Sequence, residues 1–436
     1  MLESRTVITL PFPVSAEELA RWCDRQVTGI LLLSNTGNTG ADDEHSRFEW
    51  MAGIGSIAKF EPETGSDPFD ALFAFHQKQK DWLFGHFGYG LKELMVKSVS
   101  RLEDPLGFPN VSFFQPRYIL LKKAGAIELH YFKESEEDDF IERLEKEIKA
   151  KTGHPRISDT DISLNQRTSR KAYLEKANNV LRHIQRGDIY EANLCMEFHS
   201  QDTVIDPVRT FLSLNRLSPM PNAVFYKAGK RYLLCASPER FLQKQGNRII
   251  SQPIKGTIRR GKDHAEDEQL KRHLQGSQKE RSENVMITDL VRNDLSRTAV
   301  RGSVRVLELF GLKSYRRIHQ LVTTVAAEID PKLPWTEVIR HAFPMGSMTG
   351  APKLRAMEII EEQESVARGL YSGSVGYITP EGDFDLNVVI RSLQYNSADR
   401  YLSAMTGSAL TAGSNPEEEY EECLLKAETM KNALTN

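Results

Sequence analysis

Residues 236–261 read ASPERFLQKQGNRIISQPIKGTIRRG, and the expected architecture can be built outward from this stretch. Runs of strand-forming residues flank the turn at 245–247, which predicts a β-hairpin. The hairpin would bring Glu239 and Lys255 side by side. Pro253 and Gly256 restrict and bend the backbone near the lysine, so its amine would stand at a rigid corner. By itself, this spacing favours an ion pair over a positioned nucleophile.

Strands and helices follow one another around the hairpin without a regular strand–helix–strand repeat. We expect helices over 169–186, 266–295 and 353–363, another from Trp335, and a last one from Pro416 that Ser414 caps. The expected strands cover 189–199, 222–228, 231–236, 248–251, 302–309, 314–328, 371–379, 384–393 and 401–410. This order predicts an α+β fold with largely antiparallel sheets.

The N-terminal part has a different pattern. Short strands are expected at 6–10, 29–33, 118–121 and 127–131, followed by a charged helix over 134–151 and a polar linker over 152–170. We therefore divide the chain into an N-terminal region, residues 1–155, which packs on the core, and a catalytic region, residues 165–436.

The composition is that of a globular enzyme, with 436 residues, 40% hydrophobic, 27% charged and a net charge of −3. With 57 basic against 60 acidic residues, nothing indicates a nucleic-acid partner. No apolar run approaches the roughly 20 residues of a membrane span, and the N-terminus lacks the pattern of a signal peptide. The four cysteines are widely spaced, and Cys195 is expected to pack rather than react. These features predict a reduced, cytoplasmic protein that does not act at a membrane.

Several further blocks occur in a fixed order along the chain. They are GDIY at 187–190, SPERF at 237–241, PIKGT at 253–257, ENVM at 283–286, DLVRND at 289–294, GAPK at 350–353 and SNP at 414–416. Together they resemble the chorismate-utilising enzymes over roughly residues 165–436, and within them the branch that forms 4-amino-4-deoxychorismate. The resemblance implies two facing, largely antiparallel β-sheets with helices outside.

Two pairs of acidic residues each share one face of an expected helix: Glu280 with Glu283, and Glu419 with Glu422. Such pairs are either solvated surface or a site for Mg²⁺, which takes carboxylate and water oxygens. The resemblance implies Mg²⁺ as cofactor, with Glu283 and Glu422 as first ligands and Glu280 and Glu419 as secondary ones.

The resemblance also implies the remaining roles. Glu239 would be the general acid for the C4 hydroxyl, and Lys255, deprotonated by burial beside cationic neighbours, would attack C2. His319 would contact the ring or the leaving hydroxyl. The expected substrate-binding residues are Arg391, Tyr371, Ser347, Thr257, Gly407, Ser408 and Lys426.

The implied reaction is amination of chorismate at C4 through a covalent Lys255 intermediate, a step toward p-aminobenzoate and folate. Because no cysteine here has the surroundings of a glutamine amidotransferase nucleophile, a separate amidotransferase partner would supply ammonia. The anthranilate-forming branch, component I, is the alternative; it has alanine where this chain has Lys255. Ala409 replaces a glycine usual in the family, and Glu191 replaces a usual glutamine, which is lysine in isochorismate-forming relatives.

Two hypotheses from other classes stay open at this point. One is a non-catalytic scaffold subunit, which would have no use for these acidic and basic residues together. The other is nucleotide binding at the Gly-rich segment 346–353, which runs into an expected helix but lacks the residue order of a phosphate-binding loop.

Overall fold

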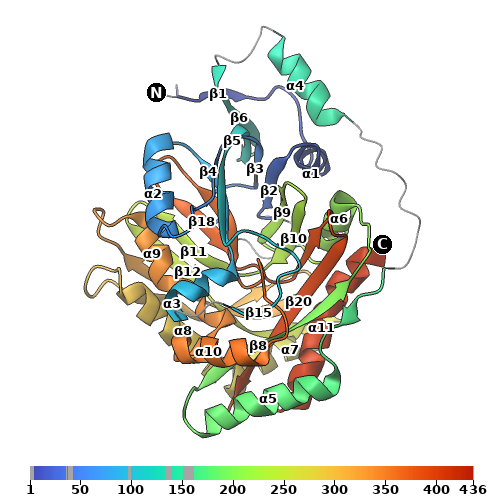
Figure 1. Ribbon diagram of the computed structural model, residues 1–436, viewed down its shortest axis with the longest axis vertical. Helices are drawn as coiled ribbons and strands as arrows, with labels where there is room; N and C mark the ends of the chain where they lie inside the picture. Colours follow the sequence, from blue (N-terminus) through green and yellow to red (C-terminus); the bar gives the residue numbers. More distant parts are fainter. Residues whose placement is uncertain are drawn as a thin grey trace.

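The computed structural model describes residues 4–35, 37, 43–96, 100–133, 139–150 and 162–435. Every strand pairing in these ranges is antiparallel, and all named strands belong to one hydrogen-bonded ladder. Figure 1 shows this ladder at the centre of the molecule with helices around it. The predicted α+β class with antiparallel sheets is confirmed.

The ladder has two arms, joined through the long strand β5 (Val111–Lys123), which pairs with β3 and β4. The first arm runs in the order β8 (Glu191–Ser200), β20 (Tyr401–Thr411), β19 (Ser392–Asn396), β10 (Arg231–Ser237), β9 (Asn222–Ala228), β2 (Thr28–Leu33) and β3 (Trp50–Phe60). At the β8 edge of this arm, the short strands β7 (Asn165–Gln166) and β16 (Gly350–Ala351) each pair with β8. Beside β5 lie β6 (Ala126–Tyr131) and then β1 (Thr6–Thr9).

The second arm runs in the order β4 (Leu83–Phe87), β17 (Ser374–Ile378), β18 (Phe384–Asn387), β11 (Arg240–Gln245), β12 (Arg248–Gln252) and β15 (Ile318–Glu328). Both β13 (Ile254–Arg259) and β14 (Arg305–Ser314) also pair with β15. The hairpin predicted around 245–247 is formed by β11 and β12, with Gly246 at a φ of 58° in the turn.

The two arms face each other across a shared apolar core. In this core Val224 of β9 and Leu233 of β10 pack in one cluster with Val375 and Tyr377 of β17. Two facing sheets are therefore present, and β5 makes them continuous.

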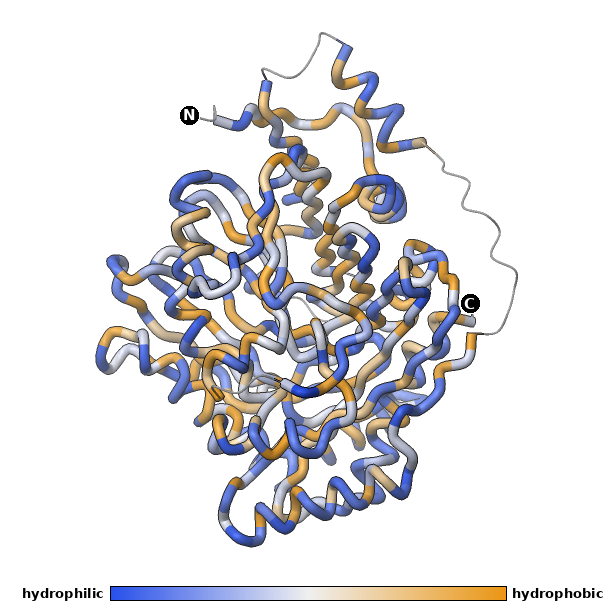
Figure 2. Tube along the Cα trace, in the orientation of Figure 1, coloured by the Kyte–Doolittle hydropathy of each residue, from blue (hydrophilic) through white to orange (hydrophobic). Residues whose placement is uncertain are grey.

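Helices cover the outer faces of the arms. A second core joins the first arm to α1 (Ala16–Arg25), α4 (Phe140–Lys149), α5 (Arg170–Gln185), α6 (Pro207–Leu217), α10 (Lys353–Gln363) and α11 (Pro416–Thr435). A third joins the second arm to α2 (Pro68–Gln79), α8 (Gln278–Ser296) and α9 (Trp335–Ala342). Hydrophilic and hydrophobic residues alternate along α5 (Figure 2), as expected for a helix with one buried face.

Some element boundaries differ from the prediction. The single helix expected over 266–295 is two, α7 (His264–Gly276) and α8, because the Ser277 side chain accepts the Glu280 N–H and starts a new helix. The cap of α11 is Asn415 rather than Ser414, since Asn415 Oδ1 accepts the Glu417 N–H. The Ser414 hydroxyl donates instead to the Ala409 carbonyl. Residues 152–161 of the expected linker and residues 134–138 and 151 of the expected charged helix lie outside the described part, so the division at 155–165 stays a prediction.

All four cysteines are buried and unpaired, and burial raises the pKa of the Cys195 thiol. This agrees with Cys195 as a packing residue. Across the described ranges, no helix is long and apolar enough to span a membrane.

Candidate active site

A large cavity that opens to solvent gathers most of the predicted site residues. Its walls come from β8, β13, β15 and β20, from α8 and α11, and from the short 3-10 helix η3 (Gly346–Met348). In the described structure the predicted residues that line it are Glu239, Lys255, Thr257, Glu280, Glu283, Ser347, Tyr371, Arg391, Gly407, Glu419, Glu422 and Lys426. The two that do not are His319 and Ser408. Segments far apart in the sequence thus meet at one place.

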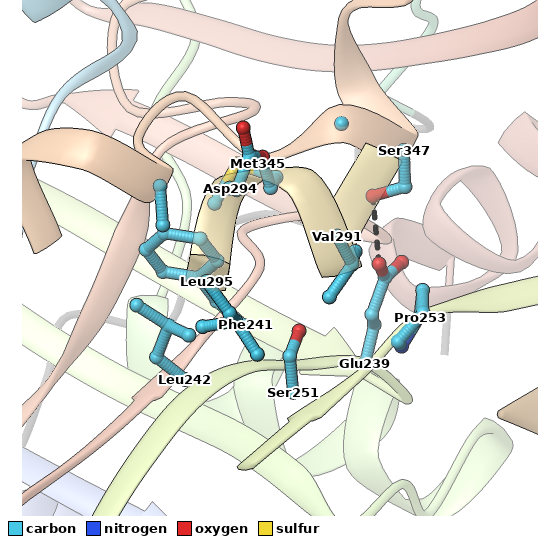
Figure 3. Close-up of a pocket in the computed structure, with 12 residues that line it drawn as sticks. Glu239, Phe241, Leu242, Ser251, Pro253, Val291, Asp294, Leu295, Met345 and Ser347 are labelled. Carbon is cyan, nitrogen blue, oxygen red and sulfur yellow. Dashed lines mark hydrogen bonds between the residues drawn. The ribbon is translucent and has the colours of Figure 1, made fainter. Parts of the chain in front are cut away.

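Glu239 stands at the corner between β10 and β11, with 5% of its surface exposed. The Ser347 hydroxyl donates a hydrogen bond of 2.7 Å to Glu239 Oε1, drawn as a dashed line in Figure 3. Burial raises the pKa of the Glu239 carboxyl to about 7, although the Ser347 hydrogen bond and the charge of Lys255 oppose the rise. A carboxyl with this pKa can hold and release a proton near neutral pH.

Lys255 projects from β13 and donates a hydrogen bond of 2.7 Å to Glu191 Oε1. Burial alone would lower the pKa of the Lys255 amine, but the charges of Glu191, Glu283 and Glu422 raise it well above its ordinary value. The expected cationic neighbours are therefore wrong: the lysine stands among carboxylates that favour its ammonium form. Its ion-pair partner is Glu191, and not Glu239 across the hairpin.

The two acidic pairs approach the cavity from two helices, Glu280 and Glu283 from α8 and Glu419 and Glu422 from α11. Within the described residues, Glu283 Oε1 is buried without a hydrogen-bond partner. Burial raises the pKa of Glu283 to about 7, with Glu280 adding to the rise and Lys255 opposing it. Glu419 accepts from Lys279 at 3.2 Å.

The donor set at this place consists of carboxylate oxygens, which suit Mg²⁺. In the described ranges no three acidic, His or Cys side chains are close enough together to hold a metal by themselves. Since Mg²⁺ usually keeps several waters and takes one or two protein carboxylates, the unpartnered Glu283 oxygen still fits such an ion.

Arg391 follows β18 with a φ of 52°, a left-handed conformation that is uncommon outside glycine. Its guanidinium faces the cavity and has no hydrogen-bond or ion-pair partner among the described residues. Burial lowers the pKa of Arg391, opposed by Tyr371 and Glu422. A guanidinium left without a partner among the described residues is suited to bind a carboxylate of a ligand.

The smaller polar residues hold one another in place. Gln320 donates to Thr257 Oγ1 at 3.1 Å, and Lys426 donates to the Gly407 carbonyl at 2.7 Å. A Cβ at Gly407 would lie 2.3 Å from Asn193 Oδ1, so glycine is required there for packing against β8.

In the described structure His319 and Ser408 lie outside the cavity lining, on the opposite faces of their strands, and their contact with the substrate stays a prediction. His319 Nε2 donates to Asp267 Oδ1 at 2.9 Å, and its Nδ1 lies 2.8 Å from Ser314 Oγ. Ser408 Oγ lies 2.8 Å from the Tyr173 hydroxyl. Because side chains alternate across a strand, the neighbours of these two residues line the cavity instead: Ile318 and Gln320 on β15, and Gly407 and Ala409 on β20.

A buried arginine holds the loop that carries Ser347, and sequence reasoning missed it. Arg368 donates to the Met348 carbonyl at 2.7 Å and to the Asn193 carbonyl at 2.9 Å, and pairs with Glu364. Asn193 in turn donates to the Ser347 carbonyl at 2.9 Å. The network joins residues far apart in the chain, so no local pattern in the sequence indicates it.

A small pocket lies behind Glu239 (Figure 3). It shares Glu239 and Ser347 with the large cavity, and most of the rest of its lining is apolar, including Phe241, Leu295 and Met345. Nearby, Lys353 buries its amine against Asp294 Oδ2 at 2.6 Å, so the lysine of the Gly-rich segment does not face a phosphate site. This removes the main support for nucleotide binding.

Comparison with known proteins agrees with this fold. A family model described as "chorismate binding enzyme" matches residues 38–432. A chloroplastic aminodeoxychorismate synthase of Arabidopsis thaliana is 42% identical over 269 residues, covering 61% of this chain and 29% of that protein. Anthranilate synthase component 1 of Thermus thermophilus is 34% identical over 356 residues, covering 80% of this chain and 76% of that protein.

Among solved structures, anthranilate synthase component I from Streptococcus pneumoniae has a TM-score of 0.76 at 22% identity, over 89% of this chain and 93% of that one. This likeness shows the fold. The chain spans less than a third of the length of the Arabidopsis relative.

Proposed function

The chain belongs to the chorismate binding enzyme family, and we propose that it replaces the C4 hydroxyl of chorismate by an amine, giving 4-amino-4-deoxychorismate for p-aminobenzoate and folate synthesis. The observation that carries the proposal is that Glu239 and Lys255 line one cavity. A proton donor and an amine at the same place are what a displacement through a covalent intermediate requires.

Arg391, whose guanidinium has no partner among the described residues, binds a carboxylate of chorismate and so anchors the substrate. Tyr371, Ser347 and Thr257 line the same cavity and restrict the ring. Holding the ring in one orientation brings C2 to the amine and the C4 hydroxyl to the acid, which lowers the entropic part of the barrier.

Glu239 protonates the departing C4 hydroxyl. A hydroxyl is a poor leaving group unless it leaves as water, and a carboxyl with a pKa of about 7 is partly protonated at neutral pH. Lys255 attacks C2 as the free amine, so its ammonium must first lose a proton. Ammonia then adds at C4 and the lysine departs.

Glu283 and Glu422 would hold Mg²⁺, with Glu280 and Glu419 in support. When bound, the ion supplies positive charge opposite a carboxylate of the substrate. The chain's own contribution is the unpartnered Glu283 oxygen and the raised pKa of that carboxyl, which a nearby cation would bring down.

A glutamine amidotransferase partner would supply the ammonia. The buried cysteines with no exposed thiol support this, because a cysteine-dependent amidotransferase site is not built from the described residues. The name of the Thermus relative, a "component 1", is consistent with an enzyme of several components.

The second candidate is anthranilate formation, favoured by the 34% identity to the Thermus relative over most of both chains. Lys255 separates the two, since the resemblance gives alanine at this place in the anthranilate-forming branch. The presence of Lys255 in the cavity wall supports C4 amination.

Mass analysis of the product tests the function. Purified protein is incubated with chorismate, Mg²⁺ and an ammonium salt. A product that retains the enolpyruvyl group and exchanges hydroxyl for amine is expected. Anthranilate with pyruvate would establish the second candidate, and an isomer of chorismate would mean that water is the nucleophile. Chorismate that raises the melting temperature without turnover would indicate a binding subunit.

A further inference from the structure

Gln320 lines the cavity from β15, and none of the roles above uses it. Its strand is paired on both sides: Gln320 lies opposite Thr257 of β13 and opposite Lys313 of β14. The preceding residue, His319, is fully buried on the other face of the strand and donates to Asp267 of α7. These contacts fix the backbone at Gln320, and alternation along the strand turns its side chain toward the cavity.

The two ends of the Gln320 carboxamide differ in their surroundings. Its Nε2 donates a hydrogen bond of 3.1 Å to Thr257 Oγ1. Within the described residues its Oε1 is buried and has no hydrogen-bond partner, and 2% of the residue is exposed. Leaving a buried acceptor unpaired costs free energy. A ligand that donates to this oxygen therefore gains an interaction that the described residues do not supply.

An amide oxygen is a neutral acceptor, which limits the groups that can bind to it. At neutral pH chorismate has two carboxylates, which only accept, and a single donor, its C4 hydroxyl. Ammonia, the second substrate of the proposed reaction, also donates, and none of the roles above binds it. Both groups belong at C4, the hydroxyl before it leaves and ammonia when it attacks. The chemistry that fits Gln320 Oε1 is therefore an uncharged O–H or N–H donor at this carbon.

Charge favours a carboxamide over a carboxylate at this place. The cavity already has many acidic side chains, among them Glu239, Glu283 and Glu422. A further carboxylate beside the ring would repel the two carboxylates of chorismate, whereas an amide oxygen accepts a hydrogen bond without this repulsion. A buried acceptor of this kind also discriminates against a ring that lacks the donor, because the acceptor is then left unpaired.

We propose that Gln320 Oε1 accepts a hydrogen bond from the donor at C4 of the bound ring, and so orients the group that leaves and the group that attacks. This rests on the proposed function. By donating its hydrogen to Gln320, the C4 hydroxyl keeps its oxygen lone pairs available for the proton of Glu239. After water has left, an N–H of ammonia donates to the same oxygen while the nitrogen lone pair attacks C4. Gln320 itself gains and loses no proton.

The first experiment measures the preference for a ring that carries the C4 hydroxyl. Calorimetry with Mg²⁺ compares chorismate with an analogue that has hydrogen in place of this hydroxyl. The full chain carries Lys255→Ala, so that no covalent adduct forms during the titration. Chorismate should bind about fivefold more tightly than the analogue. Adding Gln320→Met should remove this preference, because methionine has a similar length and lacks the amide oxygen.

Three further variants show whether the amide oxygen is responsible. Gln115→Met is the matched control, because Gln115 Oε1 is also buried and unpartnered among the described residues but lies on β5, outside the cavity lining. It should keep the preference for chorismate. Gln320→Glu keeps an oxygen at this position, so it should bind both ligands more weakly and still prefer chorismate. Gln320→Leu is a second variant without the acceptor, and it takes the place of the methionine variant if that one folds poorly.

The second experiment tests ammonia in the amination assay, with Lys255 intact. Gln320→Met should raise KM for ammonium by about fivefold, whereas Gln115→Met should leave it unchanged. A role in folding alone would lower the melting temperature without this selective change. A change in the preference for chorismate alone identifies the hydroxyl as the donor, and a change in KM for ammonium alone identifies ammonia. Either result supports the proposal.

Two results overturn the proposal. One is that the variants without the acceptor change neither the preference for chorismate nor KM for ammonium. The other is that Gln320→Glu loses the preference as Gln320→Met does, which would mean that an N–H of Gln320 faces the ligand. The proposed function has a separate outcome. If the wild type makes no aminated product while the preference still depends on Gln320, that function fails and the contact with the C4 hydroxyl stands.

Discussion

The hydroxyl of Ser347 lies 2.7 Å from Glu239 Oε1 and donates to it, although the two residues are 108 positions apart. The bond joins the corner between β10 and β11 to the η3 loop. It also sets how strongly the carboxyl holds its proton, because a donor to the carboxylate stabilises the charged form.

Ser347→Ala should therefore raise the pKa of Glu239 further above 7. A general acid is active while protonated, so the alkaline limb of kcat/KM should move to higher pH. The measurement is a pH profile of ammonium-dependent activity for both proteins. A limb that moves to lower pH would mean that Glu239 is not the acid whose ionisation limits the rate.

Glu239→Gln should change stability as well as activity. The folded protein raises the pKa of this carboxyl from 4.5 to about 7, so the wild type loses stability as pH rises between these values. The loss is about 3 kcal/mol at most. The amide variant should match the wild type near pH 4 and have the higher melting temperature near pH 8. Turnover should fall by about 100-fold. Equal melting temperatures at both pH values would contradict the buried carboxyl.

Arg391→Ala should weaken chorismate binding, raising KM by about tenfold or more, because a charge-assisted contact is lost. Arg391→Lys should recover only part of the lost chorismate binding, because an ammonium group cannot form the two parallel hydrogen bonds that a guanidinium forms with a carboxylate. The control is Arg355→Ala on α10, whose guanidinium pairs with Glu358 outside the cavity. An unchanged KM in Arg391→Ala would exclude Arg391 from substrate binding.

Glu283→Gln should weaken the activation by Mg²⁺, requiring about tenfold more of the ion for half-maximal activity. Glu417→Gln is the matched control, because Glu417 is on the outer face of α11 and pairs with Arg170. A titration of activity against Mg²⁺ compares the two. If both variants behave alike, α8 does not contribute a ligand.

Arg368→Met should destabilise the protein by about 3–5 kcal/mol, because Glu364 would be left as a buried unpaired charge. The double variant with Glu364→Gln should recover part of this loss. Denaturant unfolding measures both. Additive losses would mean that the two residues do not act as a pair.

Glu239 and Lys255 could be assigned to the site because each belongs to a short block that resembles the family, whereas spacing around the turn favoured only an ion pair between them. Of the strands of the first arm, β8, β9, β10 and β20 were also predictable from apolar runs. The strand β19 was not, because residues 384–393 were expected to form one strand and instead belong to β18, a loop and the start of β19. It was harder to predict which face of a strand lines the cavity. Side chains alternate between the two faces of a strand, and the local sequence does not show which face points toward the cavity. His319 and Ser408 were assigned to the site from the family resemblance, whereas their neighbours Gln320 and Gly407 line the cavity in the described structure.

Long-range polar contacts were beyond sequence reasoning. The partner of Lys255 is 64 positions away on β8, and the cationic surroundings expected for it are acidic instead. Burial and charge in this cavity come from five or more segments brought together by the two arms. The burial and charge in this cavity are therefore determined by tertiary structure, whereas the β11–β12 hairpin and the helix caps are determined by the local sequence.

The formation of a bond between Lys255 and chorismate can be tested most directly by intact-protein mass spectrometry with chorismate and Mg²⁺ and without ammonia. The wild type should gain the mass of chorismate less one water, with the adduct located on Lys255 by peptide mapping, and Lys255→Ala should gain nothing. A wild type that forms aminated product on later addition of ammonium, yet shows no adduct after rapid acid quenching, would contradict the covalent route.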